Sequence, residues 1–217
     1  MGFTPAVGMR LAGHASYPAP PILQIHAFAF GAWLLLLTTQ IGLVRVRRMA
    51  LHMTLGLVGV ALIPVMAVTA FVSEVYSQRF HFDHPPNNLA FFILPIFYVA
   101  AFACLATLAM LRRKNPSAHK RLILLATTII VGAAYARWWG EALASAFGDG
   151  YVGMLINSYA GTNLLLLAAV AYDLRTRGQI HRVYEIAVPG LLAGEIATSL
   201  IYHSPHWLPI ARSIIGH

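Results

Sequence analysis

The chain has 217 residues, of which 59% are hydrophobic and only 10% are charged. Soluble domains contain about 45–50% apolar and about 25% charged residues, so this composition argues against a soluble protein and for one embedded in lipid. The formal net charge is +8, but the basic residues flank apolar segments, which is typical of a topology signal and not of a nucleic-acid-binding surface.

We expect residues 1–21 to form a short segment outside the membrane. They lack the charged start and apolar block of a cleavable signal peptide, so the first spanning helix is expected to act as its own insertion signal. That helix is predicted over residues 22–44, directly after two prolines, because proline suits the first turn of a helix. A second helix is predicted over residues 52–76, with Pro64 near its middle as a kink.

Residues 78–88 are polar and contain two consecutive prolines, so we predict a loop there. Cys104 follows in an apolar run; it is the single cysteine, which excludes an intrachain disulfide, and we expect it to be a small buried hydrophobic residue. The tail, residues 204–217, contains Trp207 and Arg212, which suit a membrane interface. The other helices are predicted over residues 89–111, 119–147, 151–172 and 183–202.

Most of the basic residues lie on one side of the predicted membrane region, and Arg137 lies within the fourth predicted helix. Only Arg10, Arg79 and Arg212 lie on the other side. Because basic loops remain in the cytoplasm, both termini are predicted to lie on the opposite side of the membrane. We expect this membrane to be the inner membrane of a bacterium. The sequence therefore predicts an all-α integral membrane protein whose spanning domain, residues 22–203, is a bundle of six helices in three hairpins. The basic side carries Arg45, Arg47, Arg48, Arg112, Arg113, Lys114, Lys120, Arg121, Arg175, Arg177 and Arg182.

Histidines follow these basic clusters at the predicted helix starts. His52 is followed by Gly56 and Gly59 on the same helix face. Small residues let a second helix approach closely, and they would equally leave room beside an imidazole for a flat macrocycle. His26 lies in the first helix near the outer side, either as a functional group or as an interfacial residue near lipid headgroups.

Ionisable groups inside a bilayer are expensive, so each is a candidate for function. Arg137 and Glu141 are four residues apart and can pair, either as an anchor near the interface or as a site for an anionic or carbonyl group. Glu195 falls near the middle of the last helix, where a lone carboxylate would be neutral or paired. The outer half of the fifth helix is unusually polar, and its side chains would line a small cavity or bond helices together. These side chains are Asn157, Ser158, Thr162 and Asn163.

Two pairs of histidines with His-x-x-His spacing are predicted on the outer side. His81 and His84 flank Asp83, and His203 and His206 form the second pair. Imidazole and carboxylate groups suit Zn or Cu, so both pairs are candidate metal ligands. Each pair also lies near proline, away from a regular helix, and the spacing is not specific.

Residues 22–142 resemble an uncharacterised family of bacterial multi-pass membrane proteins. The resemblance lies in a His early in the first helix, a Gln near its end, a basic loop, a His-x-x-x-Gly helix start and a later His-Lys/Arg-Arg start to a helix that ends in Arg. The chain departs from the family at Leu122-Ile123, where Trp-Met is usual. The resemblance implies a membrane protein without implying an activity. The matching residues are His26, Gln40, Arg45–Arg48, His52, Gly56, His119 and Arg137.

In layout the chain is also similar to b-type cytochromes, in which two histidines from different helices hold each haem. The analogy implies haem b held by His52 and His119, with Arg48 and Lys120 or Arg121 near the propionates. His26 is then a candidate haem ligand on the outer side of the membrane.

Four functions remain open from the sequence, and the oligomeric state is open as well. The first is haem binding with electron transfer between membrane quinone and another acceptor. The second is transport or binding of a small molecule in a polar pocket. A metal-dependent membrane hydrolase and a non-catalytic assembly subunit are the third and fourth. The pocket of the second function would contain Arg137, Glu141, Asn157, Asn163 and Glu195.

Overall fold

A computed structural model describes residues 4–15, 18–84 and 88–217, and these residues form helices and connecting turns without a strand. Six segments are long and apolar enough to cross a membrane, which confirms the predicted multi-pass helical protein. They are α2 (Pro21–Arg45), α3 (Met49–Asp83), η1 with α4 (Leu89–Phe92 and Ile93–Leu111), α5 (Pro116–Phe147), α6 (Tyr151–Arg177) and α7 (Arg182–Tyr202). Two short helices complete the fold, α1 (Thr4–Leu11) and α8 (Trp207–Ile215).

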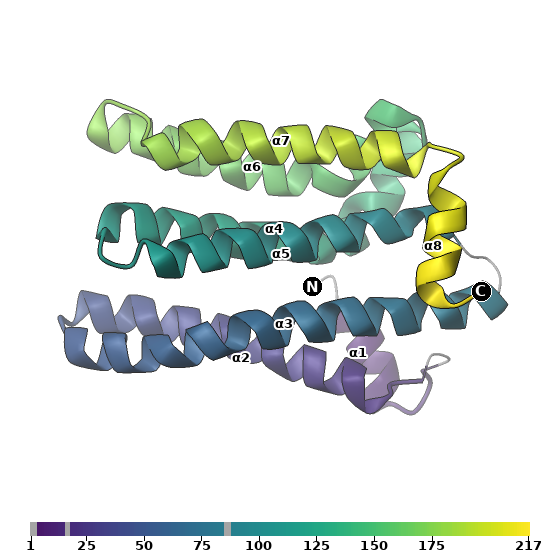
Figure 1. Ribbon diagram of the computed structural model, residues 1–217, viewed down its shortest axis with the longest axis horizontal. Coiled ribbons are helices and arrows are strands. Elements are labelled where there is room, and N and C mark those ends of the chain that lie inside the picture. The colour runs from purple at the N-terminus through teal and green to yellow at the C-terminus, as the bar shows by residue number, and fades with distance from the viewer. Residues whose placement is uncertain (1–3, 16–17, 85–87) are drawn as a thin grey trace.

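The long helices lie side by side in pairs: α2 with α3, α4 with α5, and α6 with α7 (Figure 1). The tight turns of the three pairs lie at one end of the bundle, which we call the turn end. It consists of residues 46–48, 112–115 and 178–181. Helix α8 crosses the opposite end, which we call the α8 end.

Local chemistry explains where the helices start at the turn end. The Asn115 side chain accepts a hydrogen bond from the Ala118 N–H at 3.1 Å, and a proline occupies the first position of α5. His181 caps α7 in the same way, because its Nδ1 accepts from the Val183 N–H at 3.1 Å. Gly178 ends α6 with a φ of 69°, a left-handed conformation that favours glycine.

The predicted loop over residues 78–88 is wrong for residues 78–83, because α3 continues to Asp83. The polar side chains in this stretch bond within the helix: Gln78 Nε2 donates to Glu74 Oε1 at 2.8 Å. Such bonds satisfy polar groups without ending a helix. Residues 85–87, with both prolines of the predicted loop, lie outside the described residues. Similarly, α6 extends beyond the predicted position 172 to Arg177.

The tail forms a packed cap at the α8 end. Trp207 Nε1 donates to the Ala90 carbonyl at 3.1 Å, and its ring is buried. Arg79 Nε of α3 donates to the Ile215 carbonyl at the end of α8. These contacts hold the tail against α3 and η1. They come in addition to the membrane-interface role that we predicted for Trp207.

Cys104 is exposed, so the prediction of a buried cysteine is wrong. Helix α4 is apolar around its whole circumference, and its packed side consists of other residues, including Phe102, Leu105 and Ala106. When a helix is apolar all round, its sequence does not distinguish the lipid-facing side from the packed side.

Glycines allow neighbouring helices to approach in the middle of the bundle. A Cβ at Gly194 of α7 would lie 2.4 Å from Cε2 of Phe97 on α4. By contrast, a Cβ at Gly190 on the same helix would meet nothing within 4 Å. Close packing through small residues is a common basis of helix association in membranes.

We therefore expect Gly194→Ala to destabilise the detergent-purified protein by about 1–3 kcal/mol, because the Phe97 ring must move out of a packed core. Gly190→Ala is the matched control, and it should leave stability unchanged or raise it by about 0.5–1 kcal/mol. Thermal unfolding of both variants measures the difference. Equal melting temperatures would contradict the close α4–α7 contact.

Candidate functional site

The most deeply buried acidic side chain between the spanning helices is that of Glu195 on α7, which is 2% exposed. Asn163 of α6 donates a hydrogen bond from Nδ2 to Glu195 Oε2 at 2.8 Å. The structure therefore brings together two residues that the sequence placed in one polar pocket. The other carboxyl oxygen, Oε1, is buried without a hydrogen-bond partner.

Three further oxygen atoms near this pair are also buried without a partner. They are the Tyr159 hydroxyl, Thr162 Oγ1 and Asn163 Oδ1, all on α6. A buried polar atom without a hydrogen bond costs about 1–3 kcal/mol, and native proteins contain few of them. Four such atoms on Glu195 and these three residues are typical of a site that receives a polar partner. We call these four residues the Glu195 site.

Gly132 of α5 provides room beside this site. A Cβ at that position would lie 2.8 Å from Thr162 Oγ1 and 3.0 Å from the Tyr98 hydroxyl oxygen. The Tyr98 hydroxyl of α4 donates to the Ser158 carbonyl at 2.8 Å, and its ring meets Tyr159 edge-on at 5.6 Å between centroids. Tyr98 therefore lies at the border of the Glu195 site, held by a hydrogen bond and a ring contact. Sequence analysis missed both tyrosines, because a tyrosine in an apolar run resembles any other core aromatic.

A cavity of about 200 Å³ lies at the α8 end of the same helices. Asn157 contributes to its wall, with Nδ2 bonded to the Gly148 carbonyl at 3.2 Å and a buried Oδ1 that has no partner. Ser158, whose carbonyl accepts from Tyr98, also lines this cavity. The cavity and the Glu195 site are thus adjacent along α6. The lining residues are Asn88, Phe91, Leu94, Ala136, Gly140, Asp149, Met154, Asn157, Ser158 and Tyr202.

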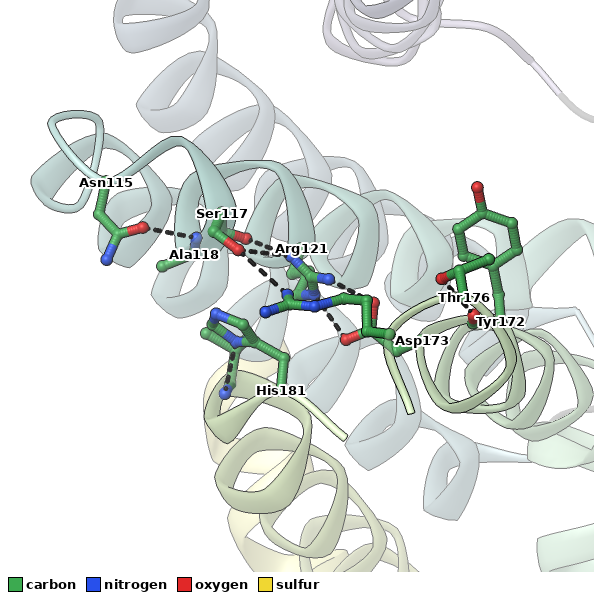
Figure 2. A network of polar contacts seen from close by, with 10 residues as sticks. Asn115, Ser117, Ala118, Arg121, Tyr172, Asp173, Thr176 and His181 are labelled. Atoms are coloured by element: carbon green, nitrogen blue, oxygen red, sulfur yellow. Dashed lines mark hydrogen bonds and ion pairs between the residues drawn. The ribbon is translucent and has the colours of Figure 1, made fainter. Parts of the chain in front are cut away.

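A second cluster of polar side chains lies at the turn end, and these side chains form hydrogen bonds with one another (Figure 2). Arg121 of α5 forms a two-pronged ion pair with Asp173 of α6; its Nε donates to Oδ2 at 2.8 Å and its Nη2 donates to Oδ1. Arg121 Nη1 donates to the carbonyl and hydroxyl of Ser117, each at 2.8 Å. Arg121 is 4% exposed and Asp173 is 3% exposed, so this is a buried structural pair. Its carboxylate was missed by sequence analysis, although it is an isolated acidic residue beside a basic loop.

His181 lies beside this ion pair, in the turn before α7 (Figure 2). Burial lowers the pKa of His181 below its ordinary value of 6.5, and the positive charges of Arg121 and Arg177 lower it further. The neutral ring suits its role, because Nδ1 must be unprotonated to accept the Val183 N–H. Protonation would remove this cap and add a positive charge beside two guanidinium groups.

The sign of the pH effect follows from the lowered pKa. The stability that His181 contributes is fully present above its ordinary pKa of 6.5 and is lost as the pH falls through the lowered folded-state value. We expect the melting temperature to fall on acidification from about pH 7.5 to about pH 5, the range in which histidine titrates. His181→Asn keeps a capping side chain but cannot titrate, so it should reduce this fall. The exposed His206→Asn is the control, and an identical fall in both variants would contradict the assignment.

The two histidines that the cytochrome analogy pairs lie at the turn-end starts of different helices. His119 of α5 bonds the Ala109 carbonyl of α4 through Nδ1 at 2.8 Å. His52 of α3 has a buried Nδ1 without a partner, and its carbonyl accepts from Gln40 at 3.0 Å. The glycines after His52 face α2: a Cβ at Gly56 would lie 3.7 Å from Gln40 Nε2. The packing alternative for these glycines therefore has direct structural support.

The candidate basic residues have different roles. Arg48 is exposed at the start of α3, whereas Arg121 is engaged with Asp173. Arg137 Nη1 donates to the Ala133 carbonyl at 2.9 Å, and its charge interacts with that of Glu74 on α3. Glu74 was missed because it belongs to another helix pair. Glu141, the partner predicted for Arg137, is exposed.

The histidines of the two His-x-x-His pairs mostly bond backbone carbonyls. His81 and His84 bond the carbonyls four residues earlier in α3 through Nδ1, at 2.8 Å and 2.7 Å. His203 bonds the Ser199 carbonyl at 2.8 Å and the Asp149 carbonyl at 3.0 Å, whereas His206 is exposed. Within residues 4–15, 18–84 and 88–217, no group of three or more His, Cys, Asp or Glu side chains is arranged to hold a metal ion. The last candidate, His26, has Nδ1 3.3 Å from Thr69 Oγ1.

In comparisons with protein-family models, curated proteins and solved structures, nothing matches this chain.

Proposed function

We propose that this protein binds a small polar molecule at the Glu195 site and carries it across a membrane. The observation that carries the proposal is the set of four buried oxygen atoms without partners on Glu195, Asn163, Thr162 and Tyr159. A ligand with several hydrogen-bond donors would satisfy them. Hydrogen bonds to such a ligand would offset the cost of burying these oxygen atoms.

The location of the site supports a transport role. Glu195 is near the middle of α7 and Asn163 is near the middle of α6, and both helices are long and apolar enough to span a bilayer. Ionisable and amide groups at the depth of the bilayer centre are typical of substrate pathways. Lipid contact alone would not require a carboxyl group at this position.

The orientation that we propose follows from the basic residues at the turn end. Eleven of the Lys and Arg residues belong to the loops and helix ends of this side, where α2, α4 and α6 turn back. Because basic loops remain in the cytoplasm, we place the turn end there and both termini on the outer side, in the inner membrane of a bacterium. The α8 end then faces outward.

Glu195→Gln tests this function, with Glu185→Gln as a matched control on the exposed side of the same helix. A panel of small amines, polyols and amino acids is screened by thermal unfolding of the purified protein. A ligand at 100 times its Kd stabilises the folded state by about 2.7 kcal/mol, a shift of about 5–10 °C for a chain of this size. We expect Glu195→Gln to lose this shift and Glu185→Gln to keep it. A ligand that stabilises both variants equally would assign its site elsewhere.

A second candidate is haem b binding at the turn end, with electron exchange with membrane quinone. Its support is the His119 ring: a bond from Nδ1 to a backbone carbonyl is the contact that orients metal-ligating histidines and leaves Nε2 for the iron. His52, with its unpartnered Nδ1, would be the second ligand from another helix. Arg48 lies at the same end to face a propionate.

A visible spectrum of the purified protein with and without dithionite tests this second candidate. Bound haem b gives a reduced Soret band with sharp α and β bands, and His52→Ala and His119→Ala should each abolish the signal, since each removes an axial ligand. His206→Ala, on an exposed side chain, should retain it. A colourless wild-type protein, or a spectrum that survives both ligand substitutions, would remove this function.

A further inference from the structure

We propose that the ligand of the Glu195 site is a small organic cation and that it arrives through the cavity at the α8 end. The inference rests on the proposed function, to which it adds a ligand class and a direction of access. It is carried by the chemistry of the cavity wall and by the adjacency of the cavity to the buried carboxyl group.

The cavity wall favours a positive ligand. Among the described residues that line it, Asp149 is the one Asp or Glu, and there is neither Lys nor Arg. The other polar residues of the wall are Asn88, Asn157, Ser158 and Tyr202, and Asn88 Nδ2 donates to the Tyr202 hydroxyl at 2.7 Å. The rings of Phe91 and Tyr202 also line the cavity, and aromatic faces attract cations. One carboxyl group, that of Asp149, therefore belongs to a residue of the cavity, and a second, that of Glu195, lies deeper between the helices.

The distance between the cavity and the Glu195 site is short along three helices. On α6, Thr162 follows the cavity residue Ser158 by one turn. On α7, Glu195 lies two turns from the cavity residue Tyr202, which is about 10 Å along the axis. On α4, Tyr98 follows the cavity residue Leu94 by one turn. Both places thus face the same space between these helices, one or two turns apart.

Tyr98 separates the cavity from the Glu195 site. Its hydroxyl donates to the carbonyl of Ser158, a residue of the cavity wall. On the other side, a Cβ at Gly132 would meet both the Tyr98 hydroxyl oxygen, at 3.0 Å, and Thr162 Oγ1, at 2.8 Å. Its ring packs edge-on against Tyr159. Rotation of this buried side chain would break its hydrogen bond and its ring contacts with Phe97 and Tyr159, and it would join the cavity to the Glu195 site. Tyr98 is therefore positioned to act as the inner gate of the cavity.

The turn end is packed around a buried ion pair. Arg121, Asp173 and Tyr184 are all buried there, and they join α5, α6 and α7. The guanidinium carbon of Arg121 lies 5.8 Å from the centre of the Tyr184 ring. Breaking one side of a buried ion pair is costly, so this end is closed in the present conformation. Access to Glu195 in this conformation is from the α8 end.

Cysteine labelling tests the route and the ligand class together. The single native cysteine is exposed and is first replaced by Cys104→Ala. Gly140→Cys then introduces a thiol into the cavity, where a Cβ has room because its nearest contact is the Asn157 carbonyl at 3.9 Å. Asn157→Cys is the second cavity variant, and exposed His206→Cys is the control outside the cavity. Spheroplasts are treated with two membrane-impermeant methanethiosulfonates, one carrying trimethylammonium and one carrying sulfonate.

We expect both cavity cysteines to react from outside. The cationic reagent should be favoured over the anionic one about tenfold more strongly than at His206→Cys, because an acidic cavity concentrates cations. Thr162→Cys, below the gate, should react slowly and should speed up about tenfold when Tyr98→Ala is added. Val46→Cys at the turn end should stay unlabelled until the membrane is opened.

Two results would overturn the inference while leaving the Glu195 site intact. One is labelling of both cavity cysteines only after the membrane is opened, with ligand shifts still lost in Glu195→Gln. The other is a reagent preference equal to that of His206→Cys, which would remove the cationic ligand. Ligand shifts that persist in Glu195→Gln would instead remove the proposed function, and with it the ligand that this route is meant to deliver.

Discussion

Hydrocarbon offers no hydrogen-bond partner, so a polar side chain between membrane helices must be bonded within the protein or to something that the protein holds. The two polar clusters of this bundle meet that requirement differently. At the turn end, Arg121 and Asp173 satisfy each other, with Ser117 taking the remaining donors. At the Glu195 site, one carboxyl oxygen and three neighbouring oxygens remain without partners. This contrast is why we interpret the first cluster as structural and propose the second as the site for a ligand.

Much of the fold could be predicted from hydropathy, because six apolar segments separated by basic or polar turns define the spanning helices. The positions where the helices end, and the packing of the tail, were less predictable. Nothing in residues 78–83 shows that α3 continues outside the apolar region, because polar residues form helix as well as loop. The α8 cap depends on contacts such as Arg79 with the Ile215 carbonyl, between residues far apart in the chain. Contacts of this kind have no local pattern.

The Glu195 site was predictable in part for the same reason that the helices were. A carboxyl and an amide in apolar helices are visible exceptions, and Asn163 and Glu195 were identified on that basis. Tyr98 and Tyr159 were not, since tyrosine carries both an apolar ring and a hydroxyl and only the fold shows which part is used. Gly132 gives no signal at all, because its role is to leave space beside two hydroxyl groups on other helices.

The two ends of the bundle differ in a way that suits the carrier function that we propose. A site that exchanges its ligand with both sides must close one end while the other is open, or the membrane would leak. Here the closed end is fixed by a two-pronged arginine–carboxylate pair, whose planar geometry lysine could not reproduce. At the α8 end, the cavity is separated from Glu195 by the buried side chain of Tyr98, which is held by one hydrogen bond and by ring contacts. Because the pair joins α5 to α6 at the basic end, where water and headgroups can receive the separated charges, its opening is less costly than it would be at the bilayer centre. In the proposed carrier, the transition to a state open at the turn end would therefore begin with the separation of Arg121 from Asp173, while the bond from Tyr98 to Ser158 keeps Glu195 separated from the α8 end.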